Sequence, residues 1–195
     1  MYKRGYFASG PHNAREMLNR WGIYLIVVPH LPHTHLNGAS FLSPQGRPII
    51  GLTLRHDRLD NFWFTLLHEL GHILLHIQDQ RQVFFDDTEH LMTTADTVEE
   101  QEANAFARDT LLPAQAWTRH AAALTAGEHE QLVLELAEEI QISPAIVTGR
   151  IRYETGDYRR CGSLVGHRQV REQFSEYQQG VLQTKTGRLP ADSRT

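Results

Sequence analysis

The chain has 195 residues, a formal net charge of -4 at pH 7, 41% hydrophobic and 22% charged residues, and a single cysteine. This composition excludes fibrous and intrinsically disordered proteins and is typical of a globular chain long enough to bury a core. Because Cys161 has no second cysteine to pair with inside the chain, a disulfide scaffold is excluded and a reducing, cytoplasmic location is expected.

Secretion and membrane insertion are not indicated. Residues 1–17 contain no continuous apolar segment behind their basic residues, so they do not resemble a secretory signal. The longest apolar run is interrupted by His68, Glu69 and His72, which argues against a membrane span. We therefore expect no membrane partner.

The first third of the chain predicts one helix followed by a small sheet. Apolar side chains have helical spacing over 13–21, and Gly22 then leads into a β-branched segment at 23–28. Two further strand candidates, 39–42 and 47–54, are separated by the turn sequence SPQG and predict a hairpin. We expect these strands to form a small antiparallel sheet.

A long helix is predicted next and would be the central element of the fold. From Asp60 onward, apolar spacing from Phe62 to Ile77 maintains one face over almost five turns. Residues 78–97 are acidic and polar, apart from a short phenylalanine pair, and are expected to form a connector. Residues 98–113 predict a second helix with carboxylates in its first turn and Pro113 at its end.

The C-terminal part predicts two more helices and a tail. The first helix covers 128–140, and the second covers 142–154 with Ser143 as its N-cap and Pro144 at its first position. From about Gly180 onward the chain has no aromatic residue and little apolar content, so a disordered tail is expected.

The central helix carries the sequence HExxH within its apolar run. His68 and His72 are four residues apart and share one face, with Glu69 about 100° around the helix. In zinc peptidases two such histidines hold the metal, and the glutamate acts as a general base on water. Two core histidines bonded to backbone carbonyls are the structural alternative. The metzincin continuation is excluded, because Leu75 and Gln78 replace the glycine and histidine that it requires.

A catalytic zinc needs a third protein ligand, and the second helix offers three carboxylates, Glu99, Glu100 and Glu102. Asn104 follows Glu100 by four residues and shares its face, beside alanines small enough for close helix packing. This spacing favours Glu100 as the ligand and Asn104 as a polar partner that orients a zinc histidine. Glu99 and Glu102 are then expected to be solvated charges.

The remaining histidines and the cysteine are given lesser roles. His76 continues the line of His68 and His72 by one turn, about 6 Å further along the axis, so we expect it to support the site rather than bind the ion. No regular ligand spacing relates the loop histidines His30, His33 and His35. Nothing near Cys161 in the sequence resembles an activating base, which argues against a nucleophile.

Together, "FTLLHELGHILLH" and "EEQEANAFARDTLLP" resemble the ImmA/IrrE family of gluzincin-like metallopeptidases. The resemblance covers about residues 12–175 and is closest to a subset fused to antitoxin-type regulators. It depends on the following positions: HELGH at 68–72, Glu100, Ala103, Asn104, Phe106, Ala107 and the closing LLP at 111–113.

The resemblance implies Zn²⁺ bound by His68, His72 and Glu100, with Glu69 as the general base. It also implies an α+β, minimal zincin fold, in which a small antiparallel sheet packs on the HExxH helix. We expect a peptidase core at 1–120, a helical subdomain at 121–178 that completes the cleft, and a tail at 179–195. The implied substrate is a repressor or antitoxin-like protein cut at an exposed linker, as in stress-response, mobile-element or toxin-antitoxin control.

Peptide hydrolysis also needs a group that stabilises the developing oxyanion. The C-terminal part offers three candidates for this role, Tyr153, His167 and Arg150. The sequence does not choose among them, and it does not predict the oligomeric state.

Two other functions compete with proteolysis. One is a non-catalytic regulator that binds a toxin or repressor without cutting it. The other is DNA binding, because 136–151 resembles a helix-turn-helix with Gln141 at the turn position. Residues 141–195 carry nine basic and five acidic side chains, and the basic face would comprise Arg150, Arg152, Arg159, Arg160, Arg168 and Arg171.

Overall fold

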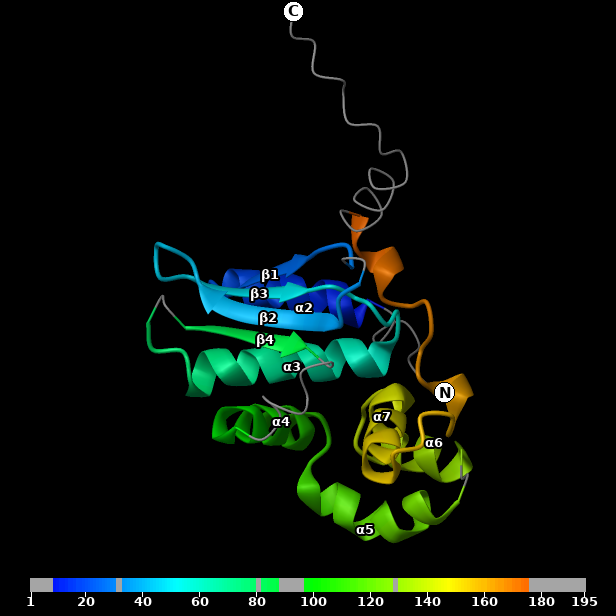
Figure 1. Cartoon of the computed structure of the whole chain (residues 1–195). Helices are drawn as coiled ribbons and strands as arrows, with labels where there is room; N and C mark the ends of the chain where they lie inside the picture. Colours follow the sequence, from blue (N-terminus) through cyan, green and yellow to red (C-terminus); the bar gives the residue numbers. More distant parts are fainter. Residues whose placement is uncertain (1–8, 31–32, 80–81, 88–96, 128–129, 176–195) are drawn as a thin grey trace, which may run out of the picture.

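A computed structural model describes residues 9–30, 33–79, 82–87, 97–127 and 130–175 (Figure 1). The fold is α+β, as predicted, with a four-stranded sheet packed on a long helix and further helices beyond it. The elements are α2 (Gly10–Arg20), β1 (Tyr24–Val27), β2 (Leu36–Leu42), β3 (Pro48–Leu52), α3 (Leu59–Leu75), β4 (Val83–Asp87), α4 (Val98–Leu111), α5 (Ala114–Ala126), α6 (Glu130–Glu139) and α7 (Pro144–Thr155), with short 3-10 turns at Gly162–Leu164 and Arg171–Gln173.

The sheet has the strand order β1-β3-β2-β4. The predicted hairpin of β2 and β3 is confirmed, and β4 also pairs antiparallel to β2. The expectation of a wholly antiparallel sheet is wrong, because β1 runs parallel to β3. Strand β2 runs antiparallel to β3, and β1 runs in the same direction as β3. Because β1 pairs with β3 and not with β2, its ladder in the described part of the sheet is parallel.

Strand β4 lies within the segment expected to be a connector. Phe84 pairs with Ser40 and Phe85 with Ala39 across the β2 ladder. A five-residue strand with so short an apolar segment gives little local signal, and its pairing partner lies more than forty residues earlier in the chain. The strand therefore depends on the tertiary fold.

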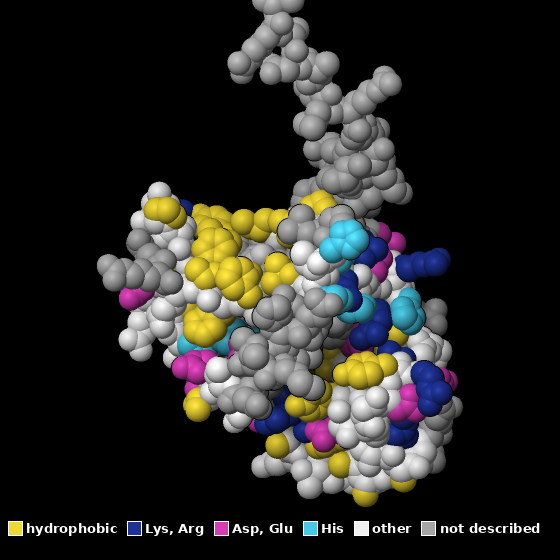
Figure 2. Space-filling model, viewed as in Figure 1, with side chains coloured by type: hydrophobic (Ala, Val, Ile, Leu, Met, Phe, Trp, Pro, Cys, Tyr) yellow, Lys and Arg dark blue, Asp and Glu magenta, His cyan; other side chains and the backbone are white. Residues whose placement is uncertain are grey.

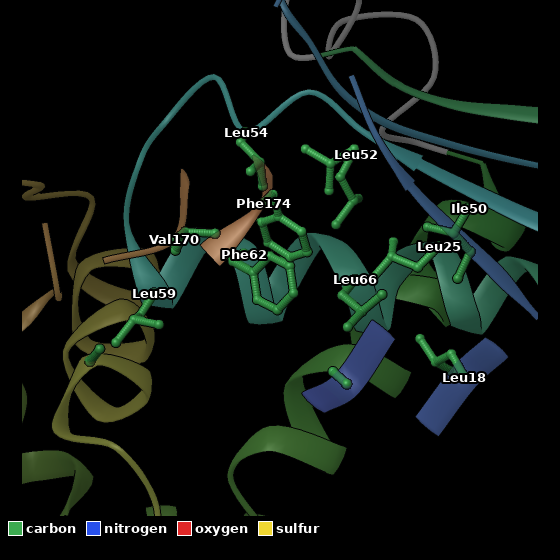
Figure 3. Close-up of a cluster of buried hydrophobic side chains, with 13 residues drawn as sticks. Leu18, Leu25, Ile50, Leu52, Leu54, Leu59, Phe62, Leu66, Val170 and Phe174 are labelled. Carbon is green, nitrogen blue, oxygen red and sulfur yellow. The ribbon is translucent and has the colours of Figure 1, made fainter. Parts of the chain in front are cut away.

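The two faces of the sheet differ in their surroundings. The face toward α3 contributes Leu25, Ile50 and Leu52 to the main core, where they meet Phe62 and Leu66 of the helix (Figure 3). Other apolar side chains of β1 and β4 are exposed, and Figure 2 shows hydrophobic side chains gathered over this region. Helix α3, which carries HExxH, packs on this face of the sheet and so has one side buried.

Close packing of α4 on α3 depends on small residues. Ala103 and Ala107 are fully buried, as the predicted small face of α4 requires. A Cβ atom added at Gly71 of α3 would lie 3.2 Å from the Ala103 Cα atom, so glycine permits the two helices to approach. This approach brings the first turn of α4 to the HExxH histidines.

Helices α5, α6 and α7 surround a second hydrophobic cluster, in which Leu124, Leu136, Val147 and Ile151 are buried. Helix α5 was not predicted, whereas α6 and α7 were, and Ser143 caps α7 as expected by accepting a hydrogen bond from Ala145 N. Helix α7 begins at Pro144, the predicted first helical position.

The chain after α7 returns to the main core. Val170 and Phe174 are fully buried there, and the Phe174 ring lies 6.1 Å from the Phe62 ring (Figure 3). Asp57 Oδ1 accepts hydrogen bonds from the Val170 and Arg171 amides. The division into a core and a helical subdomain stays a prediction, and the expected tail lies outside the described residues.

Across the described part of the chain, none of the helices combines the length and apolarity needed to cross a bilayer.

Candidate metal centre

Helix α3 carries His68 and His72 on its buried side, one turn apart, where they are 3% and 1% exposed. Helix α4 supplies Glu100 from its first turn, which begins at the N-cap Thr97. The Thr97 side chain accepts a hydrogen bond from the Glu100 amide and so satisfies one of the free donors at the helix start. The cap fixes where α4 begins and therefore where the carboxylate points.

The three side chains converge on one point. The Nε2 atoms of His68 and His72 are 3.0 Å apart, and each lies 3.3 Å from one Glu100 oxygen. Tetrahedral ligands about 2.0–2.1 Å from a zinc ion lie about 3.3–3.4 Å from one another. In the described residues these three form the one group of histidine, cysteine or carboxylate side chains placed to hold a metal.

Glu100 is held as a carboxylate. Its partial burial acts to raise its pKa, but hydrogen bonds from His68 and His72 outweigh burial and lower the pKa to about 2. Burial lowers the pKa of His72 despite the Glu100 hydrogen bond. For His68, burial is outweighed by Glu100 and by the nearby Glu69 charge, and the pKa is raised. An anionic oxygen between two imidazoles is suited to a divalent cation.

The ring nitrogens that face away from the convergence point have protein partners. His68 Nδ1 lies 3.0 Å from Asn104 Oδ1, and because an amide oxygen only accepts, the histidine donates here and keeps its Nε2 lone pair. His72 Nδ1 lies 3.1 Å from His76 Nδ1. Asn104 and His76, both predicted to support the site, thus contact its two histidines.

Phe84 of β4 restricts the His72 ring from one side. The two rings are stacked at a centroid distance of 4.2 Å and an interplanar angle of 13°. Sequence reasoning did not identify this residue, because its role depends on a strand that only the tertiary structure reveals. The ring holds the orientation of the imidazole without using a hydrogen bond.

Glu69 lies between α3 and β2 and is 0% exposed. Its Oε2 accepts a 2.6 Å hydrogen bond from the Ser40 hydroxyl, while Oε1 is buried and has no hydrogen-bond partner among the described residues. A Cβ atom at Gly38 would lie 2.6 Å from that Oε1. Burial raises the pKa of Glu69 to about 8, against the lowering effects of His68 and the Ser40 hydrogen bond.

Ser40 and Gly38 were missed by sequence reasoning, although a signal was present. Strand β2 places Gly38 and Ser40 at alternate positions on the side facing α3, where large apolar residues are usual. A small residue and a hydroxyl at two such positions indicate that a bulky polar group approaches from the helix. Only the structure identifies that group as Glu69.

A cleft of about 320 Å³ opens beside the three converging side chains. His68, Glu100 and Asn104 line it, whereas Glu69 does not belong to its described lining. The other walls come from α3 and its N-cap, from β4, α4 and α7, and from the segment after α7. They include Arg58, Asp60, Phe64, Phe85, Asp86, Arg108, Arg150, Tyr153 and Tyr158.

The three oxyanion candidates have different positions. Tyr153 lines the cleft and is 56% exposed. Arg150 also lines it, but its guanidinium is paired with Glu154 at 2.7 Å and lies over the Trp117 ring. His167 is exposed and bridges to Arg58 by backbone pairing, outside the described cleft lining.

Much of the predicted basic face is used inside the protein. Arg152 and Arg160 are buried, and both donate to backbone carbonyls. Arg171 donates to the Leu54 carbonyl. Gln141 does take the left-handed turn conformation, with φ 58°, between α6 and α7. The helix pair therefore has a helix-turn-helix connection without a continuous exposed row of arginines.

Other residues considered from sequence lie away from the converging group. His30, His33 and His35 do not belong to any metal-competent group in the described part of the chain. Cys161 is buried in the second hydrophobic cluster.

Comparison with known proteins agrees with this geometry. A family model described as the IrrE N-terminal-like domain, of the M78 peptidases, matches residues 23–152, which include the HExxH helix, Glu100 and Asn104. No curated protein matches the chain. The matched region covers two thirds of the sequence. The chain therefore belongs to the family of IrrE N-terminal-like domains.

Proposed function

We propose that this chain is a zinc-dependent endopeptidase that cleaves a regulatory protein at one exposed segment. The observation that carries the proposal is the convergence of His68, His72 and Glu100 beside a buried Glu69 at the edge of a cleft. Two imidazoles and one carboxylate are a donor set of catalytic zinc sites, in which the fourth coordination position is left open for water or substrate.

A bound zinc ion would activate water and polarise a peptide carbonyl. Within that chemistry we assign Glu69 as the general base. Ser40 bonds only to Oε2, so an ionised Glu69 keeps Oε1 to accept a proton. The fixed carboxylate can then pass the proton to the leaving nitrogen. A Cβ atom at Gly38 would lie within 3.0 Å of both Glu69 and Thr65, so glycine leaves the room that the Glu69 carboxylate occupies.

Tyr153 is the best placed of the oxyanion candidates. Its side chain is exposed in the cleft, and a phenol can donate a hydrogen bond to a developing negative charge. Arg150 is less free to move, since Glu154 and Trp117 engage its guanidinium. Replacing Tyr153 with Phe is expected to lower kcat without changing zinc content.

The first experiment measures metal content. Purified wild type and Glu100→Ala are dialysed and analysed by elemental mass spectrometry, and we expect about one zinc per wild-type chain and less in the variant. An absence of zinc in both proteins after zinc is supplied would refute the peptidase proposal.

The second experiment tests cleavage. Wild type and Glu69→Gln are produced in cells of the source organism, and newly formed protein N-termini are identified by labelling and mass spectrometry. We expect a small set of new termini with wild type that is absent with Glu69→Gln, which keeps all three zinc ligands. Identical sets would favour a regulator that binds its partner without cutting it.

The choice of a repressor or antitoxin-like substrate depends on the family resemblance. If the substrate is of this class, the new termini should fall in an exposed linker of a repressor or antitoxin-like protein. Direct DNA binding is disfavoured, because the buried Arg152 and Arg160 and the engaged Arg171 leave few free cations on α7 and the segment after it. Duplex binding that weakens steeply with added salt would reverse that judgement.

A further inference from the structure

Beyond the convergent ligands, a chain of polar side chains leads from His72 to the surface of α4. His72 Nδ1 lies 3.1 Å from His76 Nδ1, and His76 Nε2 lies 3.0 Å from Glu102 Oε2. The side chain of His76 is 7% exposed and that of Glu102 is 56% exposed. The chain thus runs from a buried ligand to a carboxylate in contact with solvent.

The chemistry of each group sets the direction of these hydrogen bonds. An ionised carboxylate only accepts, so the His76 Nε2 atom must carry the hydrogen that it shares with Glu102. A neutral His76 that is protonated at Nε2 has its lone pair on Nδ1. That lone pair faces His72 Nδ1, which must therefore be the donor.

The contact with His76 also determines which nitrogen of His72 can bind a metal. If Nδ1 carries the hydrogen, the lone pair lies on Nε2, and this atom faces His68 and Glu100. Asn104 achieves the same result for His68 through one hydrogen bond. For His72 the corresponding acceptor is itself a histidine, so a second group is needed to determine its tautomer.

Resting on the metal site of the proposed function, we propose that Glu102 and His76 are positioning residues that fix the metal-binding tautomer of His72. Glu102 sets the tautomer of His76, and His76 sets that of His72. This gives a role to a carboxylate that the sequence indicated to be only a solvated charge. Partners of metal-bound histidines typically contribute about 10–100-fold to metal affinity.

Zinc affinity provides the first test. Dissociation constants are measured by competition with a chromophoric chelator for wild type, Glu102→Ala, Glu102→Gln and the control Glu99→Ala. The control removes the same charge from an exposed position in the same helix. We expect Glu102→Ala to weaken zinc binding about 10-fold. Glu102→Gln should stay near wild type, because its amide oxygen still accepts from His76, and Glu99→Ala should be unchanged.

Two results of that measurement would overturn the inference. Equal affinities for Glu102→Ala and Glu99→Ala would mean that the hydrogen bond has no specific effect. A loss for Glu102→Gln as large as that for Glu102→Ala would mean that charge, rather than an accepting oxygen, is what matters. Glu102 is exposed, so these variants are expected to fold normally.

Histidine NMR provides a second, independent readout. In protein labelled with ¹⁵N in its imidazoles, the metal-free wild type should show His76 protonated at Nε2, and Glu102→Ala should lose that preference. Protonation of wild-type His76 at Nδ1 would refute the inference. Because this readout needs no metal, it still decides the inference if wild type binds no zinc, a result that would refute the proposed function separately.

Discussion

Because Glu69 is buried, we expect the stability of the metal-free protein to fall as the pH rises. The ordinary pKa of this group is 4.5, and burial raises it to about 8 in the folded chain. Between these two pH values the folded state keeps a proton that the unfolded chain has released. The folded state therefore binds more protons, and the free energy of unfolding falls as pH rises through this range.

The perturbation that isolates this effect is Glu69→Gln, which keeps the shape of the side chain but cannot ionise. The interval from pH 4.5 to about pH 8 corresponds to about 5 kcal/mol. Because structural relaxation and water entry reduce the cost of a buried charge, we expect at least about 2 kcal/mol to be observed. The metal-free variant should be more stable than wild type at pH 8 by that amount, and the difference should vanish near pH 4.5.

The assay is urea-induced unfolding of chelator-treated wild type and variant at several values between pH 4.5 and pH 8.5. Glu99→Gln is the control, because Glu99 is exposed and its replacement should not change with pH. A constant difference between wild type and Glu69→Gln across the range would refute the reasoning. The same variant should also lose peptidase activity. The group predicted to act as the general base would then be one that lowers the stability of the metal-free fold at alkaline pH.

Three further predictions concern packing, metal binding and a buried cation. Gly38→Ala places a methyl group 2.6 Å from the Glu69 carboxylate and should lower the free energy of unfolding by about 1–3 kcal/mol in urea titrations, whereas Gly51→Ala, with its nearest neighbour 3.9 Å away, should not. Glu100→Ala should weaken zinc binding more than about 100-fold in chelator competition, since even indirect partners contribute about 10–100-fold. Arg160→Ala removes donors to three carbonyls at the end of α5 and should lower Tm by about 6–12 °C in calorimetry, for a loss of about 3 kcal/mol.

Local spacing accounts for the features that could be predicted. The i, i+4 spacing of His68 and His72 places them on one helix face whatever the rest of the fold does, and Glu100 and Asn104 are related in the same way. Ser143 and Pro144 marked the start of α7 because capping is a property of neighbouring residues. The structure confirms these positions because each depends on backbone geometry within a few residues.

Features that depend on pairing between distant segments could not be predicted. The parallel alignment of β1 with β3 and the existence of β4 result from strand pairing across the sheet. The contact of Ser40 with Glu69 joins residues 29 positions apart, and neither residue type indicates its partner. Helix α5 was missed as well, and its apolar side packs into the cluster shared with α6 and α7.

The sequence by itself determined which side chains share one helix, because the types and spacing of His68, Glu69 and His72 predict a metal-ligand pair and a neighbouring base there. The tertiary structure alone decided how those groups are held. It placed Ser40 on Glu69 and the His76–Glu102 pair behind His72, by packing β2 and α4 against α3. The physical reason is that helix geometry is local, whereas burial and hydrogen-bond partners come from segments that only folding brings together.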